Sequence, residues 1–246
     1  DTKSPYVVPP GIPRDIDNTT IVQRRTNEQS LQLCFNDLSD GDAKAVFKES
    51  NFDLINYGRI KMFIHAEPNN GDILSDNEIN AFLRFGSDYE NNYYEIELPL
   101  RVTQPSLINQ NSSNLSRIIW PEENEINLSI EELLSLKSIR NREGIDVNSP
   151  FSKISANGKY IIRIKGRPSV GSILNFMIGV KNPLSDDRSS KSACIWFNEL
   201  RLTDFDRTKG WAANTSLNLK LSDIGTVSSS LRYTSVGFGS IQQRIS

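Results

Sequence analysis

Apolar and polar side chains alternate with a period of two in many short segments between residues 29 and 207. This alternation is typical of β-strands that bury one face and expose the other. The segments lie at residues 31–35, 60–65, 83–85, 93–98, 160–165, 174–180 and 194–199. Asn, Asp, Gly and Pro separate them, as expected of turns. The pattern predicts a mainly β fold with a jelly-roll-like β-sandwich.

The apolar face of each predicted strand identifies the expected core. Two sheets that pack face to face bury the inward side chains of both. Replacing Phe176 with Ala should then cost roughly 3–5 kcal/mol. The side chains expected between the sheets are Leu33, Ile64, Leu98, Ile162, Phe176 and Phe197.

One segment has helical spacing, at about residues 129–142. Ser129 and Glu132 have the spacing of a capping box, which predicts the start of a helix. Gly144 follows the last apolar positions and predicts its end. Residues 104–116, which precede it and are rich in Asn and Ser, are expected to form a loop.

The chain is expected to have three parts. Residues 1–28 form an extended arm with four prolines between positions 5 and 13, either a linker or an arm packed on a surface. Residues 29–207 form the sandwich. Residues 208–246 begin with two alternating stretches around a turn at 223–226, which predicts a β-hairpin followed by a loop.

Composition narrows the function classes. The formal net charge of −2 argues against a nucleic-acid partner. One histidine and two cysteines argue against a zinc ribbon, an iron–sulfur protein and a disulfide-rich scaffold. No apolar run is long enough for a transmembrane helix. The chain begins with Asp1 and no signal peptide is apparent, so we interpret it as a mature or excised piece of a longer protein.

Few residues suggest catalysis, and we expect neither catalytic residues nor a cofactor. His65 has no nucleophile motif nearby and is interpreted as a residue at the end of a strand. Glu95 and Glu97 lie two apart in one strand, a pattern that a sandwich-type glycosidase could use for its acid and nucleophile. The preferred interpretation places both carboxylates on a solvated outer face.

The sequence offers only weak candidates for metal, phosphate and disulfide sites. Gly237–Gly239 lacks the third glycine and the helix of a phosphate loop. Cys34 and Cys194 could form a disulfide in an oxidising compartment, although we favour two small buried thiols. Two acidic clusters could bind calcium, but aspartates that bond their own backbone turns are preferred. The clusters are Asp37, Asp40 and Asp42, and Asp72, Asp76 and Glu78.

Several motifs together resemble one known family. They are YVVPPGIPR at 6–14, KMFIHAE at 61–67, RFGSDY at 84–89, NNYYE at 91–95, WPE at 120–122, MIGVKNP at 177–183, NELRLTDFD at 198–206 and GFGSI at 237–241. In this order they resemble the SprA (Sov) family, the outer-membrane translocon of the type IX secretion system, which is linked to gliding motility in Bacteroidota. This chain would be an internal fragment of such a protein.

The resemblance implies a very large transmembrane β-barrel that conducts folded cargo, with the 208–246 hairpin in its wall. It implies no catalytic residues. The implied partners are a lateral-gate outer-membrane barrel protein, a periplasmic plug protein, secreted cargo, the remainder of the same chain and outer-membrane lipid.

The expected topology follows from the short turn at 223–226. Short turns of such barrels are periplasmic, so Trp211 and Tyr233 would lie at the extracellular interface. The sandwich would then be an extracellular cap or docking domain. The alternative is a secreted carbohydrate-binding jelly-roll module with Tyr89, Tyr93 and Trp120 as its sugar platform.

Overall fold

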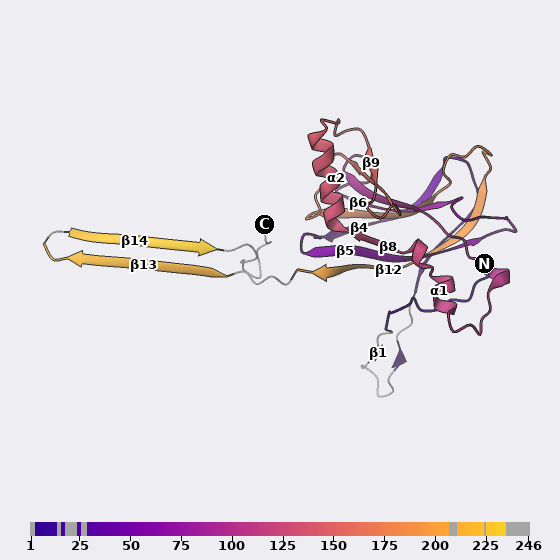
Figure 1. Ribbon diagram of the computed structural model, residues 1–246, viewed down its shortest axis with the longest axis horizontal. Coiled ribbons are helices and arrows are strands. Elements are labelled where there is room, and N and C mark those ends of the chain that lie inside the picture. The colour runs from indigo at the N-terminus through magenta and orange to yellow at the C-terminus, as the bar shows by residue number, and fades with distance from the viewer. Residues whose placement is uncertain are drawn as a thin grey trace. The chain divides into compact units, whose positions relative to one another are not determined.

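The structure is a computed structural model that describes residues 3–13, 16–17, 24–25, 29–206, 211–223 and 225–234. The chain divides into two units, Asp1–Phe205 and Asp206–Ser246, which are described separately (Figure 1). The first unit contains β1 (Ile16–Asp17), β2 (Arg24–Arg25), β3 (Leu31–Leu38), β4 (Ala43–Phe52), β5 (Tyr57–Pro68), β6 (Asn80–Gly86), β7 (Tyr93–Pro99), β8 (Ile126–Ser129), β9 (Phe151–Ile154), β10 (Ile161–Lys165), β11 (Ile173–Lys181) and β12 (Lys191–Phe205). Its helices are α1 (Leu115–Ile119) and α2 (Ile130–Arg142), with short 3₁₀ turns at Pro105–Leu107 and Glu122–Asn124. The second unit contains β13 (Ala212–Leu221) and β14 (Gly225–Thr234).

Two antiparallel sheets form the body of the first unit. One has six strands in the order β4-β11-β6-β7-β10-β9, and the other has four in the order β3-β12-β5-β8. The prediction of a mainly β fold is therefore confirmed, and two stacked sheets are consistent with a sandwich. Strands β4, β8 and β9 were not predicted, because their sequences lack a sustained apolar alternation.

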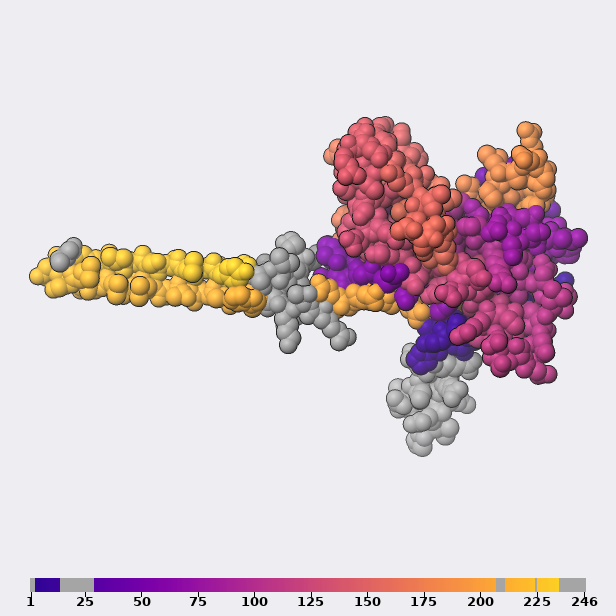
Figure 2. All heavy atoms as spheres, viewed as in Figure 1, coloured from indigo at the N-terminus to yellow at the C-terminus, as the bar shows by residue number. Residues whose placement is uncertain are grey.

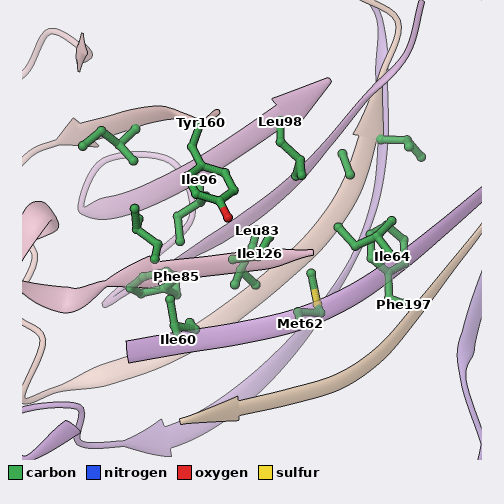
Figure 3. Packing of buried hydrophobic residues seen from close by; sticks show 14 of the residues in the cluster. Ile60, Met62, Ile64, Leu83, Phe85, Ile96, Leu98, Ile126, Tyr160 and Phe197 are labelled. Carbon is green, nitrogen blue, oxygen red and sulfur yellow. The ribbon is translucent and has the colours of Figure 1, made fainter. Parts of the chain in front are cut away.

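The core lies between these sheets and contains side chains from both (Figure 3). The sequence-based expectation is confirmed for Ile64, Leu98, Ile162, Phe176 and Phe197, all of which are buried. The remaining member, Leu33, is only partly buried and packs against the edge of the same cluster.

Helix α2 closes one side of the sandwich. It packs against β5 and β8 of the four-stranded sheet and against β9 and β10 of the six-stranded sheet. Ile130, Leu133 and Leu136 join the core. Since helical spacing places these residues on one face, the helix buries that face across the gap between the sheets.

The predicted helix is present, but its capping box is wrong in detail. The Ser129 hydroxyl accepts a hydrogen bond from the Glu131 amide at 3.2 Å. The Glu132 carboxylate instead accepts one from the Ala156 amide at 3.1 Å, because β9 lies close enough to compete for it. Gly144 follows the helix with φ of +67°, as the end signal predicts.

Two further sequence-based details are corrected. The expected loop at 104–116 contains a 3₁₀ turn and the first residues of α1. In β12 the alternation is interrupted at Glu199, whose φ is +53°, and the register shifts between Asn198 and Arg201. This irregularity returns Leu202 to the inward face of β12, where it packs against the core.

Strands β13 and β14 form a hairpin with a sheet of its own. Each strand has ten residues, slightly longer than predicted. Thr215 pairs with Leu231 and Leu219 pairs with Val227, so the apolar rows of the two strands share one face. Among the helices of the described residues, none is long and apolar enough to cross a membrane.

Candidate functional sites

Glu95 and Glu97 are buried, contrary to the expected solvated face. They lie on central strand β7, and each residue is 3% exposed. The sheet register sets Glu95 beside Arg84 of β6 and Arg163 of β10. The two carboxylates are therefore surrounded by basic side chains from both neighbouring strands, which no single-strand pattern could reveal.

The ion-pair network occupies both carboxylates. Arg84 Nε donates to Glu95 Oε2 at 2.6 Å, and Arg163 bonds Glu95 Oε1. Arg163 also donates to Glu97 Oε2 at 3.3 Å, while the side-chain amide of Asn80 donates to Glu97 Oε1 at 2.7 Å. Every carboxylate oxygen has a partner, so the geometry fits a structural network better than a glycosidase acid and nucleophile.

The described part of the N-terminal arm docks on the outer face of the four-stranded sheet. The Trp120 indole donates to Val7 O at 2.7 Å, and the Ser116 hydroxyl donates to Val8 O at 2.7 Å. In Figure 2 the indigo arm lies against the magenta segment that contains these two donors. Trp120 also belongs to a second apolar cluster, whose buried members are Phe63, Ile119, Trp120 and Trp196.

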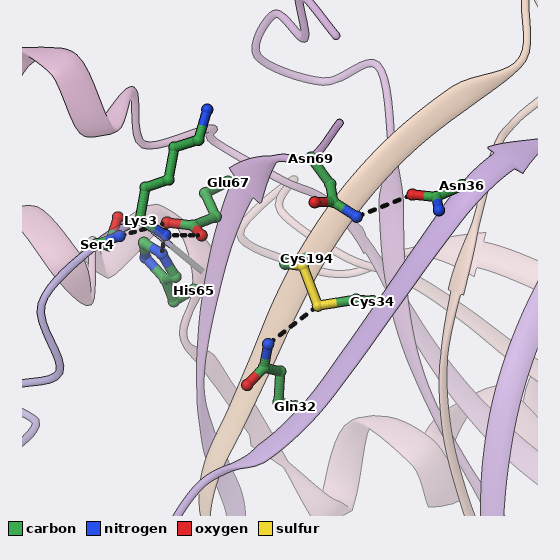
Figure 4. The surroundings of a disulfide bond; sticks show 9 residues. All are labelled: Lys3, Ser4, Gln32, Cys34, Asn36, His65, Glu67, Asn69 and Cys194. Atoms are coloured by element: carbon green, nitrogen blue, oxygen red, sulfur yellow. Dashed lines mark hydrogen bonds and ion pairs between the residues drawn. A yellow bond between two sulfur atoms is a disulfide. The ribbon is translucent and has the colours of Figure 1, made fainter. Parts of the chain in front are cut away.

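Glu67 anchors the start of the arm. Its carboxylate accepts hydrogen bonds from the Lys3 amide at 2.8 Å and the Ser4 amide at 3.0 Å (Figure 4). Burial alone would raise the pKa of Glu67, but the neighbouring His65 ring and the hydrogen bonds from Ser4 and Lys3 together hold it below its ordinary value. The ionised carboxylate therefore holds the arm, and the proline content of the arm did not reveal this contact.

His65 lies within β5 and is fully buried, so its interpretation as a strand-end residue is wrong. Its ring centroid lies 4.4 Å from that of Trp196. Nδ1 is 2.8 Å from the carbonyl oxygen of Ile119, which can only accept, so Nδ1 carries a hydrogen and donates. Nε2 lies 3.5 Å from Glu67 Oε2. The His65 ring thus links β5 to the last residue of α1, Ile119.

The three aromatic residues proposed for sugar binding do not form an exposed row. Trp120 is 1% exposed and Tyr93 is 5% exposed. Tyr89 is half-buried, and its ring centroid lies 5.0 Å from that of Phe47. Because a sugar platform needs exposed aromatic faces, these residues do not supply the one that the carbohydrate-binding alternative requires.

The candidate calcium residues are dispersed. Among the described residues, no group of three or more His, Cys, Asp or Glu side chains could hold a metal ion. Asp40 accepts from the Ser185 amide at 2.9 Å, and Asp76 accepts from the Val102 amide at 2.7 Å. Asp72 accepts from the Ser192 amide at 2.8 Å. These carboxylates connect distant loops rather than their own turns, which corrects the preferred interpretation.

Cys34 and Cys194 form a disulfide, contrary to the favoured interpretation as two buried thiols (Figure 4). The two residues are opposite each other in neighbouring strands β3 and β12. The strand order alone brings them together, and the sequence does not specify that order.

The hairpin has one apolar and one polar face. The register places Leu217 and Leu219 on the same face as Val227 and Leu231. The opposite face carries Asn214, Ser216, Asn218 and Lys220 of β13 with Thr226, Ser228, Ser230 and Arg232 of β14. The rings of Trp211 and Tyr233 lie 5.0 Å apart near the open end. The Gly237–Gly239 motif and the boundary near 207–210 lie outside the described residues.

Comparison with known proteins gives one finding. The model of the family SprA_N, described as motility related/secretion protein, matches residues 1–246. No curated protein matches the chain.

Proposed function

The chain belongs to the SprA_N family of motility-related secretion proteins, and on that premise we propose that it is part of the outer-membrane translocon of type IX secretion. This family is not an enzyme family, and membership is consistent with a place in the cell envelope. In this proposal the hairpin contributes two strands to the barrel wall, and the sandwich acts as an extracellular cap or docking domain.

The single observation that carries the proposal is the two-faced hairpin. A transmembrane β-strand needs about 9–11 residues, and β13 and β14 have ten each. Barrel strands alternate between lipid-facing apolar and lumen-facing polar side chains. Leu217, Leu219 and Leu221 are half exposed in this structure, as expected of side chains that lipid would cover.

The proposed topology places the turn after Leu221 in the periplasm, because short turns of such barrels face that side. Trp211 and Tyr233 then lie at the extracellular interface, where amphipathic rings are favoured. The residues before Trp211 would form one large extracellular excursion. A folded domain there would limit leakage through a wide channel and leave a lateral exit for cargo.

The disulfide supports an oxidising location. Disulfides persist outside the cytosol, and Cys34 and Cys194 are joined. The proposed partners are a lateral-gate outer-membrane barrel protein, a periplasmic plug protein and secreted cargo. The rest of the same chain and outer-membrane lipid would surround the hairpin.

An epitope tag tests the topology in cells that produce the protein. Residues 109–113 form a mainly exposed turn region that should accept a tag. Antibody should reach this tag on intact cells. A matched tag at Asp223 should react only after the outer membrane is permeabilised. The reverse pattern of labelling would overturn the proposed topology.

A further inference from the structure

The two sides of the sandwich differ. Helix α2 covers the side formed by edge strands β8 and β9. The opposite side is formed by edge strands β3 and β4 and contains an apolar groove of about 420 Å³. Its lining is mostly apolar and includes Leu31, Val46, Phe52, Phe176, Ile178 and Leu200.

The groove exposes side chains that a closed sandwich would bury. Leu31 is 43% exposed and Phe52 is 46% exposed, although both line the groove between the edges of the two sheets. Val46 lies opposite Ile178 of β11, and cross-strand neighbours project from the same face, so it points toward the core side. Apolar side chains gathered in this way are typical of a binding surface.

Strand β4 offers backbone groups beside the groove. It has ten residues and, among the described strands, pairs only with β11, so its other edge is open. Nine of its ten residues are exposed. An open edge of this length is a template for the addition of another strand, whose alternate side chains would enter the groove.

The charges on β4 indicate the chemistry of that added strand. Lys44 and Lys48 lie opposite Val180 and Phe176, so they share the inward face with Val46. Neither lysine forms an ion pair with the described part of the chain. Opposite charges directly across two strands are stabilising, so acidic residues would suit the positions beside both lysines.

We propose that the β4 edge binds, by strand addition, an extended segment of a partner protein that carries an apolar residue between two acidic residues at alternate positions. The apolar side chain would lie beside Val46 and fill the groove, and the acidic side chains would pair with Lys44 and Lys48. A second copy of β4 fits less well, because antiparallel pairing centred on Val46 sets Lys44 against Lys48. This site is independent of the proposed role of the hairpin.

A synthetic peptide with Glu, Leu and Glu at alternate positions and Thr between them is the probe. It should bind the 246-residue chain, kept in non-ionic detergent, as measured by fluorescence anisotropy. The double substitution Lys44→Glu and Lys48→Glu should weaken binding of this peptide about tenfold. A peptide with Lys in place of each Glu should bind this double variant and regain the affinity that the acidic peptide loses. Lys153→Glu on β9, the other edge strand of the same sheet, should leave binding unchanged.

A second measurement tests the binding mode. A peptide N-methylated at the alternate amides that would face β4 cannot donate to β4 and should not bind. Equal binding of the methylated peptide, failure of the acidic peptide to bind, or an unchanged affinity in the double lysine variant would overturn the proposal. Dimerisation of the chain through β4, detected by sedimentation and removed by Val46→Asp, would also overturn it.

Discussion

Cys34 and Cys194 are separated by 160 residues in sequence and are joined as opposite residues of β3 and β12. Strand β3 is an edge strand, and β12 is its only described neighbour. The bond therefore fixes the first strand of the sandwich to a strand near the end of the same unit. It closes a long loop, which is the case in which a crosslink most restricts the unfolded chain.

Removing this bond should lower stability by about 2–4 kcal/mol. The variant that replaces both Cys34→Ala and Cys194→Ala should show a lower urea midpoint than the unmodified protein. Adding a reductant should lower the midpoint of the unmodified protein to about that of the variant and leave the variant unchanged. A midpoint that the double substitution does not alter would show that the bond adds no stability.

Two buried tyrosines should respond differently to the loss of a hydroxyl. The Tyr160 hydroxyl accepts from the Asn127 amide and donates to Glu125 O, both at 2.9 Å. The Tyr94 hydroxyl has no hydrogen-bond partner among the described residues, and burial raises its pKa to about 12. Tyr160→Phe should cost about 1–3 kcal/mol, whereas Tyr94→Phe should be neutral or stabilising by about 1 kcal/mol. Urea unfolding of both variants measures the difference, and a large loss in Tyr94→Phe would contradict it.

Glu67 should make the docking of the arm depend on pH. Its pKa is lower in the folded protein than in the unfolded chain, so the ionised form stabilises the fold. This contribution is complete at pH 7, fades below about pH 4.3 and is lost as the pH falls through the folded-state pKa. Glu67→Gln should cost about 2 kcal/mol at pH 7, because the neutral side chain keeps only one of the two oxygens that accept from the Lys3 and Ser4 amides. The cost should vanish in acid.

Hydrogen exchange at the Lys3 and Ser4 amides measures the same effect locally. Both amides should exchange faster in Glu67→Gln than in the unmodified protein at neutral pH. Protection that is equal in the two proteins at pH 7 would show that the carboxylate does not hold the arm.

The buried ion-pair network should contribute far more than a surface pair. Glu95→Gln would leave Arg84 and Arg163 without their main acceptor, at a cost of about 3 kcal/mol. Glu143→Gln, which removes the partner of Lys153, is the matched control, because both side chains of that pair are more than 40% exposed. The control should change stability by at most about 1 kcal/mol. Similar urea midpoints for the two variants would argue against a structural role for the network.

The sequence predicted the features that depend on one strand and missed those that depend on strand order. The alternation from Glu95 to Leu98 correctly assigns Leu98 to the core. It cannot show that the glutamates are buried, because Arg84 and Arg163 come from neighbouring strands. The disulfide was missed for the same reason.

The arm and β4 show two further limits of sequence patterns. Proline in the arm predicts extended backbone, but its docking depends on Glu67 of a strand more than 60 residues away. Strand β4 places Lys44, Val46 and Lys48 on its inward face, so it lacks the apolar row that would identify it. An edge strand beside an open groove has no packing requirement that would produce such a row.

The hairpin offers a matched pair of adjacent residues for testing its role. Leu217 lies on the apolar face, and Asn218 lies on the polar face. If the apolar face meets lipid, Leu217→Arg, in the middle of β13, places a charge near mid-depth in the bilayer and should cost about 2–4 kcal/mol. Asn218→Arg points into the lumen beside Ser228 and should have little effect.

Because a destabilised barrel is degraded or fails to assemble, the amount of protein in purified outer membranes and the secretion of cargo both report this cost. We expect Leu217→Arg to lower both readouts and Asn218→Arg to leave them near the unmodified level. Equal tolerance of the two substitutions would mean that water, rather than lipid, covers both faces, and the hairpin would then lie outside the membrane.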